Sequence, residues 1–132
     1  MSRIAIALAT LLSPLLLHAQ GDVKDQVSLA LKTGNARALA THFIANIDLT
    51  VPDNSDVYSK AQAEQILRKF FDEHVPSDLS IDHEGVSKMG DRYYIGKLRT
   101  SAGEYRVTYF LKKTGEAFQV KQLRIEADKG ER

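Results

Sequence analysis

The stretch 59–75 constrains the fold most strongly, because its pattern predicts one amphipathic helix. Ser59 and Gln62 have the spacing of a capping box at the start of this helix. Pro76 ends it, since the residue before a proline is disfavoured in the α conformation. The apolar residues recur at spacings of three and four, on one stripe of the helix: Ala63, Ile66, Leu67, Phe70 and Phe71. We therefore expect this stripe to cover one face of a sheet.

Two shorter helices are predicted before this one. Residues 22–32 form the first, and Gly34 suits the left-handed position just after its end. Asn35 can cap a second short helix over residues 36–43. Each helix has an apolar side, made by Val23, Val27, Ala30 and Leu31 in the first and by Ala36, Leu39, Ala40 and Phe43 in the second.

The other segments have the two-residue period of β-strands. Residues 47–51 alternate cleanly, and we expect a turn at 52–56 followed by a brief extended pair. After Pro76, four further strands separated by turns predict an antiparallel meander, in which Gly85 marks a bulge. These strands are expected near residues 79–86, 92–100, 105–113 and 117–127. Helices on one face of such a sheet define an α+β architecture, and the long strands favour a curved sheet.

Residues 1–20 have the pattern of an export signal. Arg3 precedes an apolar run over residues 4–17, and we expect cleavage after Ala19 or Gln20. The alternative is an uncleaved anchor, although the run is short for a membrane span. Residues 21–128 are then a single exported domain, periplasmic or extracellular and without stable membrane insertion, and residues 129–132 are a polar tail.

Charge and cysteine content exclude several classes of function. Arg3 is the only charged residue in the first 20, so the rest of the chain has 17 basic and 17 acidic side chains. A neutral domain lacks the basic field that binds nucleic acid, and we expect no such partner. The sequence contains no cysteine, which excludes disulfides and thiolate catalysis. The core alone must hold this exported domain together.

Several phrases of the sequence resemble a small secreted bacterial family of unknown function within the nuclear transport factor 2-like (cystatin-like) superfamily. They are YSKAQA (58–63), FF (70–71), HEG (83–85), YIG (94–96), GEYRV (103–107) and QLRIE (122–126). The resemblance spans residues 22–127 and implies a cone-shaped fold, with three helices packed on a curved, mostly antiparallel sheet. Members of the superfamily include dehydratases, isomerases, epoxide hydrolases, transport factors and binding modules, so the fold selects no activity.

Two histidines interrupt apolar faces, and enzymes of this superfamily place an acid or base inside the cone. His74 continues the buried stripe of the helix 59–75, where it could act as a base or ligand donor. The more common role for such a residue is to interact with the helix dipole. His83 is expected on the strand face of Leu79 and Ile81, either as a cavity residue or as a hydrogen-bonded part of the core.

Four other residues complete the predicted ligand site. Tyr58, Phe70 and Tyr94 offer apolar area, and the two tyrosines add a hydroxyl each. Arg106 faces away from Tyr105 and could join a polar patch on the sheet, where cross-strand charge pairing is the alternative. We expect no metal site, since histidines 42, 74 and 83 lack ligand spacing, and no cofactor, since no glycine-rich phosphate loop occurs.

The sequence favours a non-catalytic exported domain that binds a small apolar or amphipathic molecule, or a protein partner. A lyase or isomerase with His74 or His83 as base and Tyr58 or Tyr94 as hydrogen-bond donor is the first alternative. The second is an assembly module, because Ile95 and Phe110, with Leu123 or Ile125, could form the apolar part of a homodimer interface.

Overall fold

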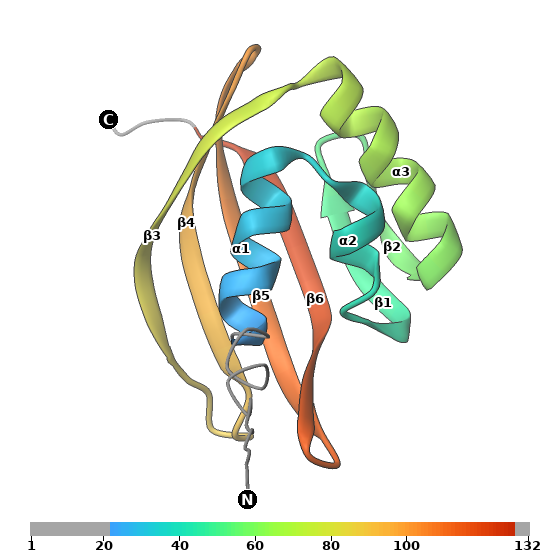
Figure 1. Cartoon of the computed structure of the whole chain (residues 1–132), viewed down its shortest axis with the longest axis vertical. Coiled ribbons are helices and arrows are strands. Elements are labelled where there is room, and N and C mark those ends of the chain that lie inside the picture. Colours follow the sequence, from blue (N-terminus) through green and yellow to red (C-terminus); the bar gives the residue numbers. More distant parts are fainter. Residues whose placement is uncertain (1–21, 129–132) are drawn as a thin grey trace, which may run out of the picture.

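The computed structural model describes residues 22–128, which form three helices and one six-stranded sheet (Figure 1). The predicted export signal and the polar tail lie outside the described residues and remain predictions. No helix within residues 22–128 is long and apolar enough to cross a membrane. In chain order the elements are α1 (Val23–Thr33), α2 (Ala36–Ala40), β1 (Phe43–Val51), β2 (Asn54–Ser59), α3 (Lys60–Glu73), β3 (Pro76–Val86), β4 (Arg92–Thr100), β5 (Gly103–Thr114) and β6 (Ala117–Ala127).

The predicted caps of the first two helices are confirmed. Gly34 has a φ of 68° after the end of α1, and the Asn35 side chain accepts a hydrogen bond from the Ala38 N–H at 3.0 Å. The predicted length of the second helix was wrong, because α2 ends at Ala40 and Phe43 begins β1. The His42 carbonyl accepts a hydrogen bond from the Val120 N–H at 2.7 Å, so the chain has already joined the sheet there.

The capping box of α3 forms as predicted. The Ser59 hydroxyl accepts from the Gln62 N–H, and the Gln62 side chain accepts from the Ser59 N–H, each at 3.2 Å. The helix ends at Glu73, two residues earlier than expected, and His74 is its C-cap. Its predicted stripe is buried, apart from Ile66, which is half-buried.

The strands lie in the order β2-β1-β6-β5-β4-β3. The meander from β3 to β6 is antiparallel as predicted, and β1 pairs with β6 in parallel, so the sheet is mixed but mostly antiparallel. The predicted turn at 52–56 was too long, because only Pro52 and Asp53 connect β1 to β2. β2 is an edge strand with mostly exposed side chains, so it carries no alternating apolar signal.

The predicted orientation of His83 was wrong. The register of β3 against β4 shifts between Ile81 and His83, not at Gly85 as expected. A one-residue shift reverses the face of every following side chain. His83 is therefore exposed opposite Ile95, on the face away from the helices. Gly85 has another role: a Cβ there would lie 2.6 Å from the Tyr93 hydroxyl, so the tyrosine side chain needs a glycine beneath it.

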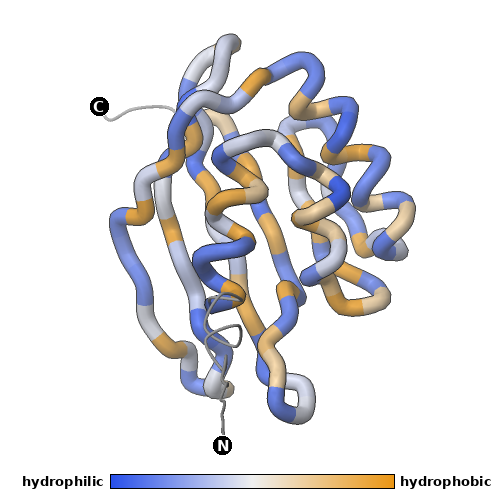
Figure 2. The backbone as a smooth tube through the Cα atoms, in the orientation of Figure 1, coloured by the Kyte–Doolittle hydropathy of each residue, from blue (hydrophilic) through white to orange (hydrophobic). Residues whose placement is uncertain are grey.

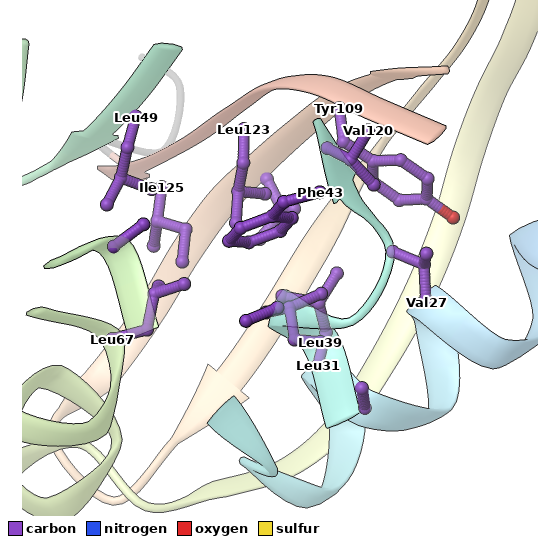
Figure 3. Close-up of a cluster of buried hydrophobic side chains, with 14 of the residues drawn as sticks. Val27, Leu31, Leu39, Phe43, Leu49, Leu67, Tyr109, Val120, Leu123 and Ile125 are labelled. Carbon is purple, nitrogen blue, oxygen red and sulfur yellow. The ribbon is translucent and has the colours of Figure 1, made fainter. Parts of the chain in front are cut away.

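All three helices cover one face of the curved sheet, which we call the inner face, and the opposite face is called the outer face (Figure 1). Hydrophobic and hydrophilic positions alternate along the strands, as a sheet with one covered face requires (Figure 2). The close-up in Figure 3 shows side chains from the helices and the strands meeting in one cluster. The space between helices and sheet is filled by buried side chains, including Phe43, Leu67, Tyr109, Leu123 and Ile125.

Candidate functional site

A pocket of about 240 Å³ lies between the C-terminal half of α3 and the turn from β1 to β2. We call it the α3 pocket. Two of its residues, Phe70 and His74, belong to the predicted site. The full lining is Val51, Pro52, Asp53, Asn54, Ile66, Lys69, Phe70, Glu73 and His74. The capped helix fixes one wall and the two-residue hairpin turn fixes the other, so both walls come from regular elements.

The α3 pocket has an apolar floor and a polar rim. Val51 and Phe70 are each 5% exposed, and both belong to the core cluster. Four polar residues of the lining are exposed and form the rim: Asp53, Asn54, Lys69 and Glu73. An apolar floor with a few polar groups around it is the usual composition of a small-molecule site.

His74 has a fixed position at one side of the pocket. Its ring stacks on Phe70 with centroids 4.2 Å apart, and it meets the edge of Tyr105 at 5.3 Å. The Nδ1 atom lies 2.8 Å from the Phe70 carbonyl oxygen, a group that only accepts, so Nδ1 donates this hydrogen bond. In the neutral ring, Nε2 is then a hydrogen-bond acceptor.

The charges of the rim are unequally compensated. Lys69 Nζ lies 3.2 Å from Glu73 Oε2, one turn along α3. Asp53 makes no ion pair with the other described residues. The C-terminal end of α3 adds a partial negative charge, and its last turn contains no basic residue. The rim is therefore weakly electronegative.

The structure does not bring the other four predicted site residues to this pocket. Tyr58 and Tyr94 lie on the inner face but line no part of the α3 pocket. His83 and Arg106 are exposed on the outer face, where Arg106 lies opposite Lys97 and Glu126 in the neighbouring strands. Three strands separate Tyr58 on β2 from Tyr94 on β4, so the six residues do not form one site.

A second polar group lies at the α1 end of the inner face. Tyr109 is fully buried, and its hydroxyl lies 2.9 Å from Ser28 Oγ and 3.3 Å from the Lys24 carbonyl oxygen. Burial raises the pKa of Tyr109 above its ordinary value. Above it, Lys24 pairs with Glu84 at 3.6 Å and lies 5.6 Å from the centre of the Tyr94 ring. The chain itself satisfies this buried hydroxyl.

The outer face carries paired charges at one end and apolar rings at the other. Arg99 pairs with Glu104 at 3.1 Å, and Arg124 with Glu126 at 3.3 Å, as expected for cross-strand and same-strand charges. Elsewhere on this face the rings of Tyr93 and Phe110 lie 5.7 Å apart, beside Ile95, and all three are half-buried. The expectation that Leu123 or Ile125 joins them was wrong, because both are fully buried in the core. None of the three helices of the described domain covers this face (Figure 1).

Sequence reasoning missed the rim of the α3 pocket. Asp53 and Asn54 were assigned to a long turn, and Lys69 and Glu73 are not part of the predicted apolar stripe of the helix. No sequence signal joins these two segments, because their contact depends on the β1–β2 hairpin lying beside α3. Among residues 22–128, no group of three or more histidine, aspartate or glutamate side chains could hold a metal ion.

Solved structures similar to this one include members of a single protein family. The structure is similar to a DUF4783 family protein from Bacteroides uniformis ATCC 8492, with a TM-score of 0.76 and 28% identity over 83% of this chain and 100% of that chain. A DUF4783 family protein from Bacteroides fragilis YCH46 is similar with a TM-score of 0.74 and 26% identity, over 81% of this chain and 100% of that chain. No curated protein matches the chain.

More distant structures show the fold alone. A domain of unknown function with a cystatin-like fold from Nostoc punctiforme has a TM-score of 0.63 and 15% identity, over 89% of this chain and 80% of that chain. The fold is nuclear transport factor 2-like and cystatin-like, as predicted. The family model described as "Domain of unknown function (DUF4783)" matches residues 24–126, almost the whole described domain. This chain therefore belongs to the DUF4783 family, whose function is unknown.

Proposed function

We propose that this protein is an exported, non-catalytic domain that binds a small amphipathic molecule in the α3 pocket. The observation that carries the proposal is the composition of the pocket, with an apolar floor at Val51 and Phe70 below an exposed polar rim. Its volume of about 240 Å³ suits a molecule smaller than a typical drug. Export rests on the predicted signal in residues 1–20.

The contacts of the pocket favour binding over catalysis. A lyase or isomerase needs, besides a base such as His74, a second polar group close to that base to stabilise the charge that develops. Within the described residues, His74 bonds to a backbone carbonyl and Glu73 pairs with Lys69, so no histidine–carboxylate pair forms there. The alternative enzyme needs Tyr58 or Tyr94 beside a histidine base, and neither lines this pocket.

Native mass spectrometry of the protein from its own envelope fraction tests the proposal. We expect a retained small molecule in wild type and in Arg68→Trp, and none in Lys69→Trp. Lys69 lines the α3 pocket, where a tryptophan would fill the space, whereas Arg68 does not line it. The two variants are matched, since each loses one ion pair within α3. Wild-type protein with nothing bound, or a molecule retained equally by both variants, would contradict the proposal.

Self-association through the outer face is a second candidate function. The supporting observation is the half-buried group of Tyr93, Ile95 and Phe110 on a face that α1, α2 and α3 leave uncovered. If this group forms a dimer interface, Ile95→Lys converts a dimer to a monomer in light scattering coupled to size exclusion. Val57→Lys, on the exposed edge strand, leaves the dimer intact. Wild-type protein that elutes as a monomer would exclude this candidate.

A further inference from the structure

We infer that the molecule bound in the α3 pocket is a small organic cation, with a primary amine or guanidinium group held at the rim. The inference rests on the proposed function of that pocket and adds the chemical class of the ligand. Four features of the pocket lead to it: the rim charges, the end of α3, the histidine tautomer and the aromatic group.

The rim charges leave a net negative site. Asp53 and Glu73 are acidic, and Lys69 is the one basic partner among the lining residues. Lys69 is turned to Glu73 along the helix, so Asp53 on the opposite wall keeps an uncompensated charge within the described residues. A ligand cation placed between the two walls would interact with both carboxylates. Both are exposed, so each contributes only modestly.

The end of α3 acts in the same direction. The last carbonyls of a helix carry a partial negative charge, which favours a cation within the final turn. Many helices place a lysine or arginine there, but the last turn of α3 contains none. The helix end is capped by His74, and both residues of that end, Glu73 and His74, line the pocket. A bound amine would complement this helix end.

The tautomer of His74 provides a hydrogen-bond acceptor. Because Nδ1 donates to the Phe70 carbonyl, the neutral ring keeps an unprotonated Nε2. Ammonium and guanidinium groups are donors without acceptor capacity, so they pair with Nε2, whereas a carboxylate does not. The neutral form of His74 therefore favours a donor group on the ligand.

The aromatic side chains suit the rest of such a ligand. Phe70 stacks on His74 and meets the edge of Tyr105 at 5.4 Å, so three rings are grouped at this side of the pocket. Phe70 and His74 line it. Aromatic faces attract cations and also accommodate methylene groups. A short alkyl chain on the floor with its cation at the rim satisfies both parts of the pocket.

Three probes of similar length separate charge from shape: n-butylguanidine as the cation, pentanamide as the neutral analogue and pentanoate as the anion. Each is titrated into ¹⁵N-labelled protein while backbone amide shifts are followed. We expect n-butylguanidine to shift the amides of Asn54, Glu73 and His74 and to bind about fivefold to tenfold more tightly than pentanamide, with pentanoate weakest.

Two carboxamide variants locate the charge effect. We expect Asp53→Asn and Glu73→Gln each to reduce the preference for n-butylguanidine over pentanamide about threefold. The control is Glu64→Gln, which also removes an ion pair within α3 but does not line the pocket, and it should leave the preference unchanged. A blocked peptide, acetyl-Gly-Arg-Gly-amide, distinguishes the source of the cation. Tighter binding of this peptide than of n-butylguanidine assigns the cation to a partner's arginine side chain.

The outcomes separate the inference from the proposed function. If pentanamide or pentanoate binds at the α3 pocket as tightly as n-butylguanidine, the inference that the ligand is a cation is wrong, and the pocket remains a binding site. A preference that Glu64→Gln weakens as much as Glu73→Gln would also overturn the inference, because the effect would not be local. If none of the probes shifts the amides that line the pocket, both the inference and the proposed function fail.

Discussion

The two ends of the inner face of the sheet use aromatic and polar residues in opposite ways. At the α1 end, the Tyr109 hydroxyl is sealed between Ser28 and the Lys24 carbonyl, and its ring is fully buried. At the α3 end, Phe70 and His74 also stack in a fixed arrangement, but they border a pocket with an exposed polar rim. Both ends contain rings and hydrogen bonds, but the chain encloses Tyr109, whereas Phe70 and His74 line a pocket.

The difference separates structural polar groups from those available to a ligand. A buried hydroxyl whose partners all come from the chain stabilises the fold and has little capacity left for another molecule. A histidine with one nitrogen bonded to the backbone and the other an acceptor keeps such capacity. We therefore assign Tyr109 to stability and His74 to binding. Mutations at the two ends should therefore have different effects on the free energy of unfolding and on ligand affinity.

The largest effect is expected for Phe70→Ala, because Phe70 belongs both to the core and to the floor of the α3 pocket. We predict a loss of about 3–5 kcal/mol in the free energy of unfolding, measured by urea denaturation, together with loss of ligand binding. Leu67→Ala on the same helix is the matched control, since Leu67 is fully buried but does not line the pocket.

Leu67→Ala should lose about 2–5 kcal/mol and still bind the ligand with wild-type affinity, at a temperature where the variant is folded. An unchanged denaturation curve for Phe70→Ala would show that the buried stripe of α3 is misassigned. Equal loss of binding in both variants would remove the distinction between core and pocket on this helix.

A smaller effect is expected for Tyr109→Phe at the other end. The change removes the hydroxyl from its contacts with Ser28 and the Lys24 carbonyl, and we predict a loss of about 1–2 kcal/mol in the free energy of unfolding. Ligand binding should not change. Tyr94→Phe is the control, because its hydroxyl makes no hydrogen bond with the described residues, and it should cost less than about 0.5 kcal/mol. Weaker ligand binding in Tyr109→Phe would contradict the assignment of this end to stability.

Much of the fold was predictable because its signals are local. The capping box at Ser59 and Gln62, the stripe of α3 and the helix stop before Pro76 all depend on residues close in the chain. The meander from β3 to β6 has clear alternation and turn residues between its strands. The resemblance to a bacterial family of unknown function in this superfamily agreed with the DUF4783 match and with the fold.

The parts that sequence reasoning missed depend on contacts between distant segments. β2 is a polar edge strand held by its pairing with β1, so its own residues carry no apolar pattern. The register shift before His83 reversed its face, and alternation alone cannot reveal an extra residue in a strand. The α3 pocket combines a helix end with a hairpin turn, which only the folded chain brings together. Phe70 and His74 were identified because their own helical pattern places them on one stripe.

A crystal structure of the protein grown with n-butylguanidine tests the central claim most directly. We predict density for the ligand in the α3 pocket, with its alkyl chain on Phe70 and its guanidinium group between Asp53 and Glu73. Density confined to another site, such as the groove between α1 and α2 beside the exposed Leu29, would contradict the assignment of the α3 pocket as the binding site of this protein.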